Sequence, residues 1–165
     1  MFFSKFKRIF RAFFRAFFRP FRKPFPAQSN GAKNIHLATG IWGEKIAAEF
    51  LMRKGFKIVG KRVRILRDEI DIIASSPLGI GGMNRLVFVE VKTRASEIFG
   101  GGIAAVDKRK RRILNRAAIR YLRDKPKTAF RFDIVEIIGV MGSDTPPKIR
   151  HFENAFNLDT RYYYG

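Results

Sequence analysis

The sequence predicts an α/β fold in which a mixed central sheet is flanked by helices. The first observation is the order of its patterns, which read as helix, three strands, helix and two strands within residues 31–165. The second is that 46% of the 165 residues are apolar, enough for one domain with a hydrophobic core. The third is a change of composition near residue 30, which separates a basic tail (1–30) from a domain (31–165).

Apolar residues at helical spacing predict a first helix over 40–54, with Thr39 as its cap and Gly55 as its end. A second helix is expected to be capped by Asp107 and ended before Pro126. In chain order, the elements after the first helix are strands over 56–64, 69–74 and 86–92, a helix over 108–124, and strands over 130–140 and 149–152.

The tail combines phenylalanine with basic residues and contains no acid. Its phenylalanines recur at three- and four-residue steps, which is the helical period, until Pro20 begins a proline-rich linker. Two interpretations remain open. Residues 2–19 form an amphipathic helix that lies in an anionic membrane surface, or they form a disordered, low-complexity extension.

Charge and cysteine content limit the partners and the compartment. The chain carries 34 Lys and Arg against 14 Asp and Glu, and eight of the basic residues but none of the acids lie in the tail, so the domain is basic by itself. Such an excess predicts a polyanionic partner, either nucleic acid or an anionic membrane. The absence of cysteine excludes disulfides, thiolate zinc sites and cysteine nucleophiles. We expect a cytoplasmic protein, or one peripheral to the inner membrane.

Charged residues interrupt the apolar strand expected over 86–92. Alternation puts its valines on one face and leaves Glu90 and Lys92 at the end of an otherwise apolar row on the other. A buried charge is costly unless it is paired or bound to a metal, so these residues indicate a functional site. A structural Glu–Lys pair near the end of a strand is the alternative interpretation.

Asp71 lies in the preceding apolar strand. If Ala74 pairs with Leu86, Asp71 falls opposite Val89, and one step of register places it opposite Glu90 on the same face. Two neighbouring carboxylates raise each other's pKa unless a cation intervenes, and Mg²⁺ or Mn²⁺ prefers oxygen ligands of this kind. An aspartate followed by Glu-x-Lys on the next strand therefore predicts metal-dependent phosphodiester hydrolysis.

Glu44 is a candidate for a third carboxylate. It shares the stripe of Ala47 and Leu51 on the first helix, so we expect it to face inward and to join Asp71 and Glu90 as a metal ligand. A first-turn residue favoured by the helix dipole is the alternative.

Five consecutive basic residues open the second helix: Lys108, Arg109, Lys110, Arg111 and Arg112. The helix dipole disfavours cations at this end, so the run predicts contacts with nucleic-acid phosphates. An ordinary solvated face is the alternative.

Several motifs occur in an order that is specific to one family. They are Gly40-x-x-Gly43-Glu44, Gly55-Phe56, Glu69-Ile70-Asp71-Ile72-Ile73-Ala74, Val87-Phe88-Val89-Glu90-Val91-Lys92-Thr93-Arg94, Arg131-Phe132-Asp133 and Asn154-Ala155-Phe156. Over 38–156 the chain resembles the YraN-like family of small bacterial proteins.

This resemblance implies a restriction-endonuclease-like fold of the PD-(D/E)xK type, close to Holliday-junction resolvases. Carried over position by position, it implies that Asp71, Glu90 and Lys92 form a metal-and-water core and that Glu44 matches the helix carboxylate of resolvase-like members. The implied activity is that of an Mg²⁺- or Mn²⁺-dependent endonuclease on DNA, with structured or branched DNA as a substrate. A non-catalytic nucleic-acid-binding protein that kept this fold and a membrane-surface adaptor acting through the tail are the alternatives.

Overall fold

The structure is a computed structural model that describes residues 31–77, 85–97, 106–125 and 128–162. The expectations for the tail, an amphipathic membrane-binding helix or a disordered extension, lie outside the described residues and stay predictions. Within the described part of the chain, no helix is long and apolar enough to cross a membrane.

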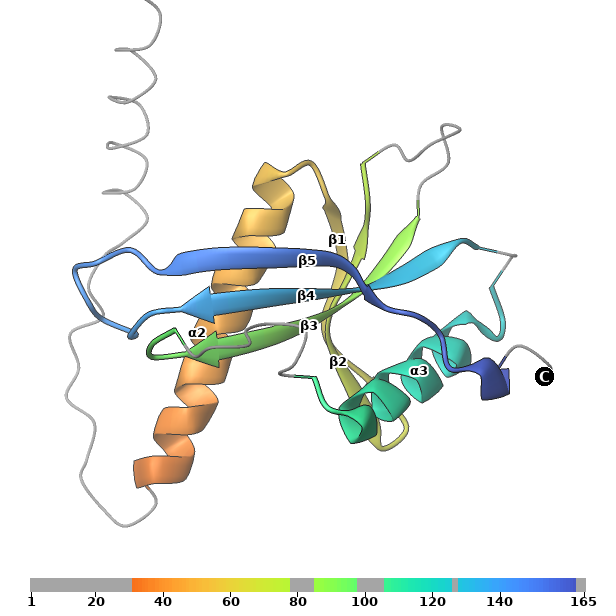
Figure 1. The fold of residues 1–165 in the computed structure, drawn as a ribbon, viewed down its shortest axis with the longest axis horizontal. Helices are drawn as coiled ribbons and strands as arrows, with labels where there is room; N and C mark the ends of the chain where they lie inside the picture. Colours follow the sequence, from red (N-terminus) through yellow and green to blue (C-terminus); the bar gives the residue numbers. More distant parts are fainter. Residues whose placement is uncertain (1–30, 78–84, 98–105, 126–127, 163–165) are drawn as a thin grey trace, which may run out of the picture. The chain divides into compact units, whose positions relative to one another are not determined.

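The described elements follow one another in the predicted order. They are α2 (Gly31–Arg53), β1 (Lys57–Ile65), β2 (Asp68–Ser75), β3 (Leu86–Arg94), α3 (Lys108–Leu122), β4 (Phe130–Ile138), β5 (Lys148–Phe156) and a short 3₁₀ helix, η1 (Thr160–Tyr162). The strands form one sheet in the order β1-β2-β3-β4-β5, in which β3 and β4 are parallel and the other neighbours are antiparallel. The predicted α/β class, a mixed sheet flanked by helices, is confirmed (Figure 1).

The sheet is covered by one helix on each face. On one face, Ala47 and Leu51 of α2 pack in a buried cluster with Ile72, Val87 and Val89. Figure 1 shows α2 passing behind β3, β4 and β5. On the other face, α3 joins a second cluster, whose buried members include Ile70, Ile73, Phe88, Leu114, Ala117, Phe132 and Phe156. Because β3 and β4 are parallel, the chain must cross over between them, and α3 is part of that crossover.

The end of α2 is the predicted one. Gly55 has φ +86°, a left-handed conformation that glycine adopts without strain. The backbone N–H of Phe56 donates to the carbonyl of Leu51 at 3.0 Å, and that of Gly55 donates to the carbonyl of Met52 at 3.0 Å. These two bonds form a Schellman motif, and the buried side chains of Leu51 and Phe56 lie in the same core cluster.

The predicted start of α2 is wrong. The helix begins at Gly31, not near Gly40, and Thr39 lies inside it rather than at its cap. The reason is that periodicity reveals only the half of a helix that is buried. Ile35, Leu37 and Ile41 in the first half are 63%, 54% and 48% exposed, so they form no stripe against the core.

The helix α3 is capped as predicted, and two arginines from its middle and end fix it to the sheet. The side chain of Asp107 accepts a hydrogen bond from the backbone N–H of Lys110 at 2.7 Å, which confirms the predicted cap. Further along, Arg116 donates to both oxygens of the buried Asp68 at 2.7 and 2.6 Å, and Arg120 donates to it at 3.2 Å. The hydrogen bond from Arg116 holds the pKa of Asp68 below its usual value, so this buried carboxylate stays charged and stabilises the fold.

A close approach of α2 to the end of β3 sets the geometry beside the predicted site. The Cβ of any larger residue at Gly43 would overlap Oγ1 of Thr93 and lie 3.2 Å from its Cβ. Only glycine therefore allows α2 to come this near β3. Gly43 precedes Glu44, and Thr93 follows Lys92, so the contact holds two predicted site residues in place.

We expect Gly43→Ala to lower the free energy of unfolding by about 1–3 kcal/mol because the added methyl group has no space. The double variant Gly43→Ala/Thr93→Ala should recover most of this loss, since Oγ1 of Thr93 is the main obstacle. Gly40→Ala is the matched control. It meets nothing within 4 Å and should stabilise α2 by about 0.5–1 kcal/mol. Chemical denaturation measures all three, and equal effects of Gly43→Ala and Gly40→Ala would contradict the close contact.

Candidate active site

The predicted site lies where β2 and β3 separate. The antiparallel ladder pairs Ala74 with Val87 and Ile72 with Val89, and its last described pair is the second of these. Continuing this register by one residue places Asp71 opposite Glu90. Of the two registers that the sequence left open, the structure therefore has the one that brings the two carboxylates together.

At this point the side chain of Asp71 replaces a backbone carbonyl as a hydrogen-bond acceptor for β3. Its Oδ2 accepts a hydrogen bond from the backbone N–H of Val91 at 2.8 Å, although the β2–β3 ladder has ended. Ile70 and Ile73 both pack on the α3 face, which strict alternation along a strand does not allow, so β2 is distorted at Asp71. On the other side, the β1 residue in register with Asp71 is Arg62, whose φ of 49° is left-handed. Backbone distortion of this kind is typical of positions where a protein orients a functional side chain.

Glu90 is buried between two lysines from different elements. Its side chain is 2% exposed. Lys92, two residues further along β3, lies 2.8 Å from Oε1, and Lys110 from the first turn of α3 lies 3.0 Å from Oε2. The alternation predicted for β3 is thereby confirmed, since Glu90 lies on the α3 face with Phe88. The lysine that completes the site from α3 is one that the sequence assigned to phosphate binding.

The surrounding groups compensate the negative charge of Asp71 only in part. Burial, together with the negative charge of Glu90, raises the pKa of Asp71 from 3.8 to about 7, against the opposing effects of the Val91 hydrogen bond and of Lys110. The folded state therefore binds the proton of Asp71 more tightly than the unfolded state does. Its contribution to stability is lost as pH rises from about 4 to about 7, which amounts to roughly 2–4 kcal/mol. Nothing in the packing of the fold requires this loss.

Lys110 responds to the same pair from the other side. Burial lowers the pKa of its ammonium, but the charges of Glu90 and Asp71 outweigh burial and raise it above the usual value. Lys110 is therefore a firmly charged cation whose ammonium lies beside both carboxylates, and not a solvated residue of the helix surface.

Glu44 lies at the edge of this arrangement. Its Oε1 accepts a hydrogen bond from Arg62 at 3.1 Å, and the other guanidinium nitrogen of Arg62 lies 3.2 Å from Glu69. Burial raises the pKa of Glu44, Arg62 lowers it, and the charges of Glu69 and Glu90 raise it further. Glu44 is thus within electrostatic range of Glu90, as expected for a residue facing inward from α2, but its nearest partner is an arginine.

The donor set at the site is small but suits a divalent cation. Among the described residues there is no group of three or more acidic or histidine side chains that could hold a metal ion. Asp71 and Glu90 form a pair, and Oε2 of Glu90 is buried without a well-formed hydrogen bond within the described part of the chain. Mg²⁺ is commonly held by one or two protein carboxylates together with water and substrate phosphate, so a two-carboxylate site fits it.

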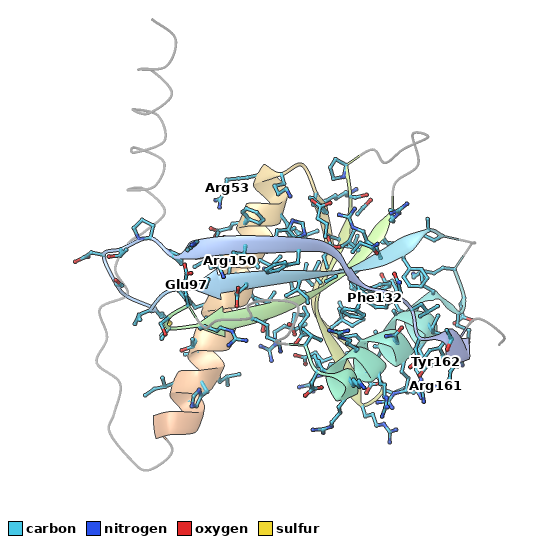
Figure 2. All side chains as sticks on the ribbon, viewed as in Figure 1. Arg53, Glu97, Phe132, Arg150, Arg161 and Tyr162 are labelled. Carbon is cyan, nitrogen blue, oxygen red and sulfur yellow. The ribbon has the colours of Figure 1, made fainter. Side chains whose placement is uncertain are left out.

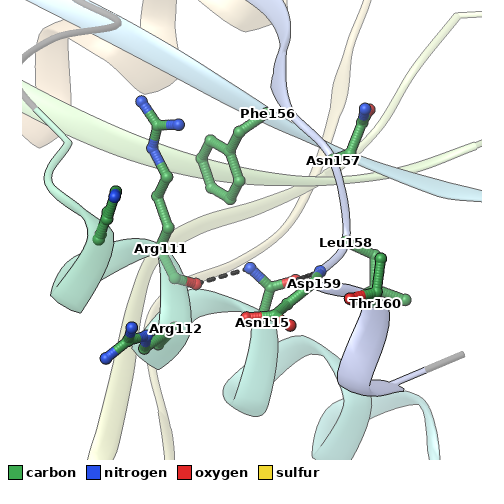
Figure 3. Close-up of a pocket in the computed structure, with 9 residues that line it drawn as sticks. Arg111, Arg112, Asn115, Phe156, Asn157, Leu158, Asp159 and Thr160 are labelled. Atoms are coloured by element: carbon green, nitrogen blue, oxygen red, sulfur yellow. Dashed lines mark hydrogen bonds between the residues drawn. The ribbon is translucent and has the colours of Figure 1, made fainter.

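The five basic residues at the start of α3 fall into three groups. Lys110 belongs to the carboxylate pair. Arg111 donates to the carbonyl of Val106 at 2.8 Å, and its guanidinium lies 5.5 Å from the ring centre of Phe156, so it joins α3 to the end of β5. Lys108, Arg109 and Arg112 are exposed. Figure 3 shows Arg111 beside Phe156, with Arg112 on the far side of the same turn of α3.

A comparison with family models matches residues 43–137 to a family described as Uncharacterised protein family UPF0102. Curated members are similar over most of their length. A UPF0102 protein of Syntrophomonas wolfei is 39% identical over 119 residues, which are 71% of this chain and 96% of the relative. Another from Symbiobacterium thermophilum is 42% identical over 118 residues, 70% of this chain and 92% of the relative. The chain belongs to the UPF0102 family.

Membership of the UPF0102 family confirms the YraN-like resemblance and its restriction-endonuclease-like fold. The matched segment begins at Gly43, whose contact with Thr93 brings α2 against β3, and it contains Glu44, Asp71 and Glu90. It also contains Lys110, which the sequence placed in the phosphate-binding run. The signal that could have singled out Lys110 is its spacing from Leu114 and Ala117, which puts it on the buried stripe of α3.

We expect Lys110→Gln to lower the free energy of unfolding by about 1–3 kcal/mol, because Oε2 of the buried Glu90 loses its cation while Lys92 remains. Arg109→Gln removes the same charge from the next residue, which is exposed, and should change stability by less than about 0.5 kcal/mol. Urea denaturation at neutral pH compares the two variants. Equal and small effects would mean that Lys110 is an ordinary surface residue.

Proposed function

We propose that the protein is a metal-dependent endonuclease that hydrolyses phosphodiester bonds in DNA, including structured or branched DNA. The observation that carries the proposal is the burial of Asp71 beside Glu90, with Lys92 held 2.8 Å from Glu90 Oε1, at the point where β2 and β3 separate. These residue types, in this chain order, match the metal-and-water core that the PD-(D/E)xK-type resemblance implies, and carboxylates that hold a metal suit phosphodiester hydrolysis.

The proposal gives the two carboxylates a chemical role that explains why the fold bears the free-energy cost of placing them together. Asp71 and Glu90 would hold a divalent cation, because its positive charge would offset the repulsion between them. When bound, such a cation supplies the charge that stabilises the attacking and leaving oxygens. Lys92 would hold an oxygen of the scissile phosphate or lower the pKa of the attacking water. Lys110 would help to hold the Glu90 carboxylate in position, because its ammonium lies 3.0 Å from Oε2.

Two buried carboxylates of the fold, Asp68 and Asp133, differ from Asp71 in the direction of their pKa shifts, which supports a functional role for Asp71. Asp133 is fully buried and accepts hydrogen bonds from Arg131, His151 and the backbone N–H of Asn154. Burial alone would raise its pKa, but these bonds hold the pKa below the usual value. Where a carboxylate of this fold is structural, as with Asp133, arginine and backbone donors satisfy it. Asp71 has only the Val91 hydrogen bond and the charge of Lys110, and these leave its pKa above the usual value.

The direct test is cleavage of linear duplex, single-stranded and four-way DNA with Mg²⁺ or Mn²⁺. We expect activity that is abolished by Asp71→Asn, by Glu90→Gln and by chelation of the metal, and lowered at least about 100-fold by Lys92→Gln, because each change removes a group that touches the metal or the phosphate.

Glu49→Gln is the matched control, since it makes the same chemical change on α2 outside the site and should leave the rate of cleavage unchanged. Asp71→Asn should still bind DNA in the presence of EDTA. If the wild type binds DNA but cleaves none of these substrates with either metal, the protein is a non-catalytic nucleic-acid-binding member of the fold and the proposal fails.

A further inference from the structure

We infer that α3 and the turn between β1 and β2 form a track that binds the sugar–phosphate backbone of DNA next to the carboxylate pair. The inference rests on the proposed function for the identity of the polymer. It goes beyond it in assigning the contacts to an open pocket and in excluding three of the five basic residues that begin α3, namely Lys108, Lys110 and Arg111.

The pocket has a volume of about 410 Å³. It is lined by Arg67 from the β1–β2 turn, by Asp68 at the start of β2, and by Arg109, Arg112, Ile113 and Arg116 of α3. The helical members stand at steps of three and four residues, so they form one stripe along α3. The pocket therefore joins two elements that are about 40 residues apart in sequence, and it is more than the start of a helix.

The charge of this pocket is only partly compensated within the described residues. Four of its six lining residues are arginines, and its one acid, Asp68, is already bound to Arg116 and Arg120. The side chains of Arg67, Arg109 and Arg112 form no close ion pair with a described residue, although Arg67 acts on Asp68 and Arg112 on Asp159 at longer range. Three guanidinium groups crowded around one hollow repel one another, and two of them stand at the positive end of the α3 dipole. A bound polyanion would relieve both effects.

Arginines in this arrangement suit phosphodiesters in particular. A guanidinium offers planar, paired donors that match the oxygens of a phosphate. A pocket that is open and lined by cations, with the apolar Ile113 at its wall, suits a backbone lying across it better than an enclosed small ligand.

The track leads to the proposed site. Lys110 contacts Glu90, and Arg109 and Arg112 lie within one helical turn of it along α3, on the neighbouring face of the helix. A strand whose scissile phosphate lies at the Asp71–Glu90 pair can therefore place its neighbouring phosphates along Arg109, Arg112 and Arg67.

A second pocket on the other side of Arg112 is the weaker candidate. It has a volume of about 380 Å³ and lies between α3 and the segment that follows β5 (Figure 3). One of its walls is Asp159, whose pKa is lowered to about 2 by the hydrogen bond from Arg161, so it stays negatively charged. The guanidinium of Arg111 in this pocket is engaged with Val106 and Phe156. The Asp159 side chain is 26% exposed, whereas that of Asp68 in the Arg67 pocket is 3% exposed, so a phosphate would meet more repulsion here.

The test measures DNA binding by the full chain in EDTA, with a fluorescent duplex and anisotropy at several salt concentrations. We expect Arg109→Gln/Arg112→Gln to reduce the slope of log affinity against log salt by about 1.8, which is two phosphate contacts, and to weaken binding roughly 60-fold at about 0.1 M salt. Arg67→Gln, from the other wall of the pocket, should reduce the slope by about 0.9.

The matched control is Arg53→Gln/Lys57→Gln, which removes the same charge from exposed positions outside the pocket. Figure 2 shows Arg53 at the end of α2, far from Arg161 and Tyr162, which lie beside α3. The control should bind almost as the wild type does. Equal losses in both double variants would mean that net charge alone attracts DNA, and the track is then overturned.

Two further readouts separate phosphate binding by these arginines from a structural role and from cleavage. The melting temperature of Arg109→Gln/Arg112→Gln should be equal to or above that of the wild type, because mutual repulsion is relieved; a melting temperature several degrees lower would show that the arginines are structural and overturn the track. Binding in EDTA does not depend on cleavage. A wild type that cleaves nothing but loses binding in the pocket variants would overturn the proposed function and leave the track supported.

Discussion

Burying two carboxylates side by side inside a sheet is the constraint on which the rest of this site depends. Two lysines, one on its own strand and one on α3, offset the cost of burying the charge of Glu90. Asp71 is held by a single backbone N–H and keeps a raised pKa. The separation of β2 from β3, the left-handed φ of Arg62 and the close approach at Gly43 are the local distortions around this pair. Their combined effect is to lower stability where a cation and a phosphate would restore it.

The direction of the pKa shift separates the roles of acids that look alike in sequence. Asp68 and Asp133 are buried, have arginine partners, and have pKa values below the usual range. Asp68 therefore joins α3 to β2, and Asp133 joins β5 to β4. Asp71 and Glu44 have pKa values above the usual range. This contrast supports the proposal that Asp71 and Glu44 face a ligand, because perturbed pKa values cluster at functional sites.

Much of the fold could be predicted because its strands and buried helix faces carry strong apolar patterns, as in the valine row of β3 and the inward stripe of α3. The first half of α2 could not, since Ile35 and Leu37 face solvent and leave no periodic signal. The Asp71–Glu90 partnership was predictable only up to a choice of two registers, because alternation fixes the face of a residue and not its neighbour across the ladder. The contact of Lys110 with Glu90 could not be predicted, because a run of like charges hides the one member that points inward.

The central claim is that Lys110 compensates the charge of Asp71 only in part in the metal-free protein, and that Mg²⁺ completes the compensation. The measurement that tests it most directly is an NMR titration of the Asp71 side-chain carboxyl, with and without Mg²⁺. The account predicts a pKa of about 7 without metal, and a fall to 3.8 or below with it. A metal-free pKa near 3.8, or a raised pKa that Mg²⁺ leaves unchanged, would contradict the claim.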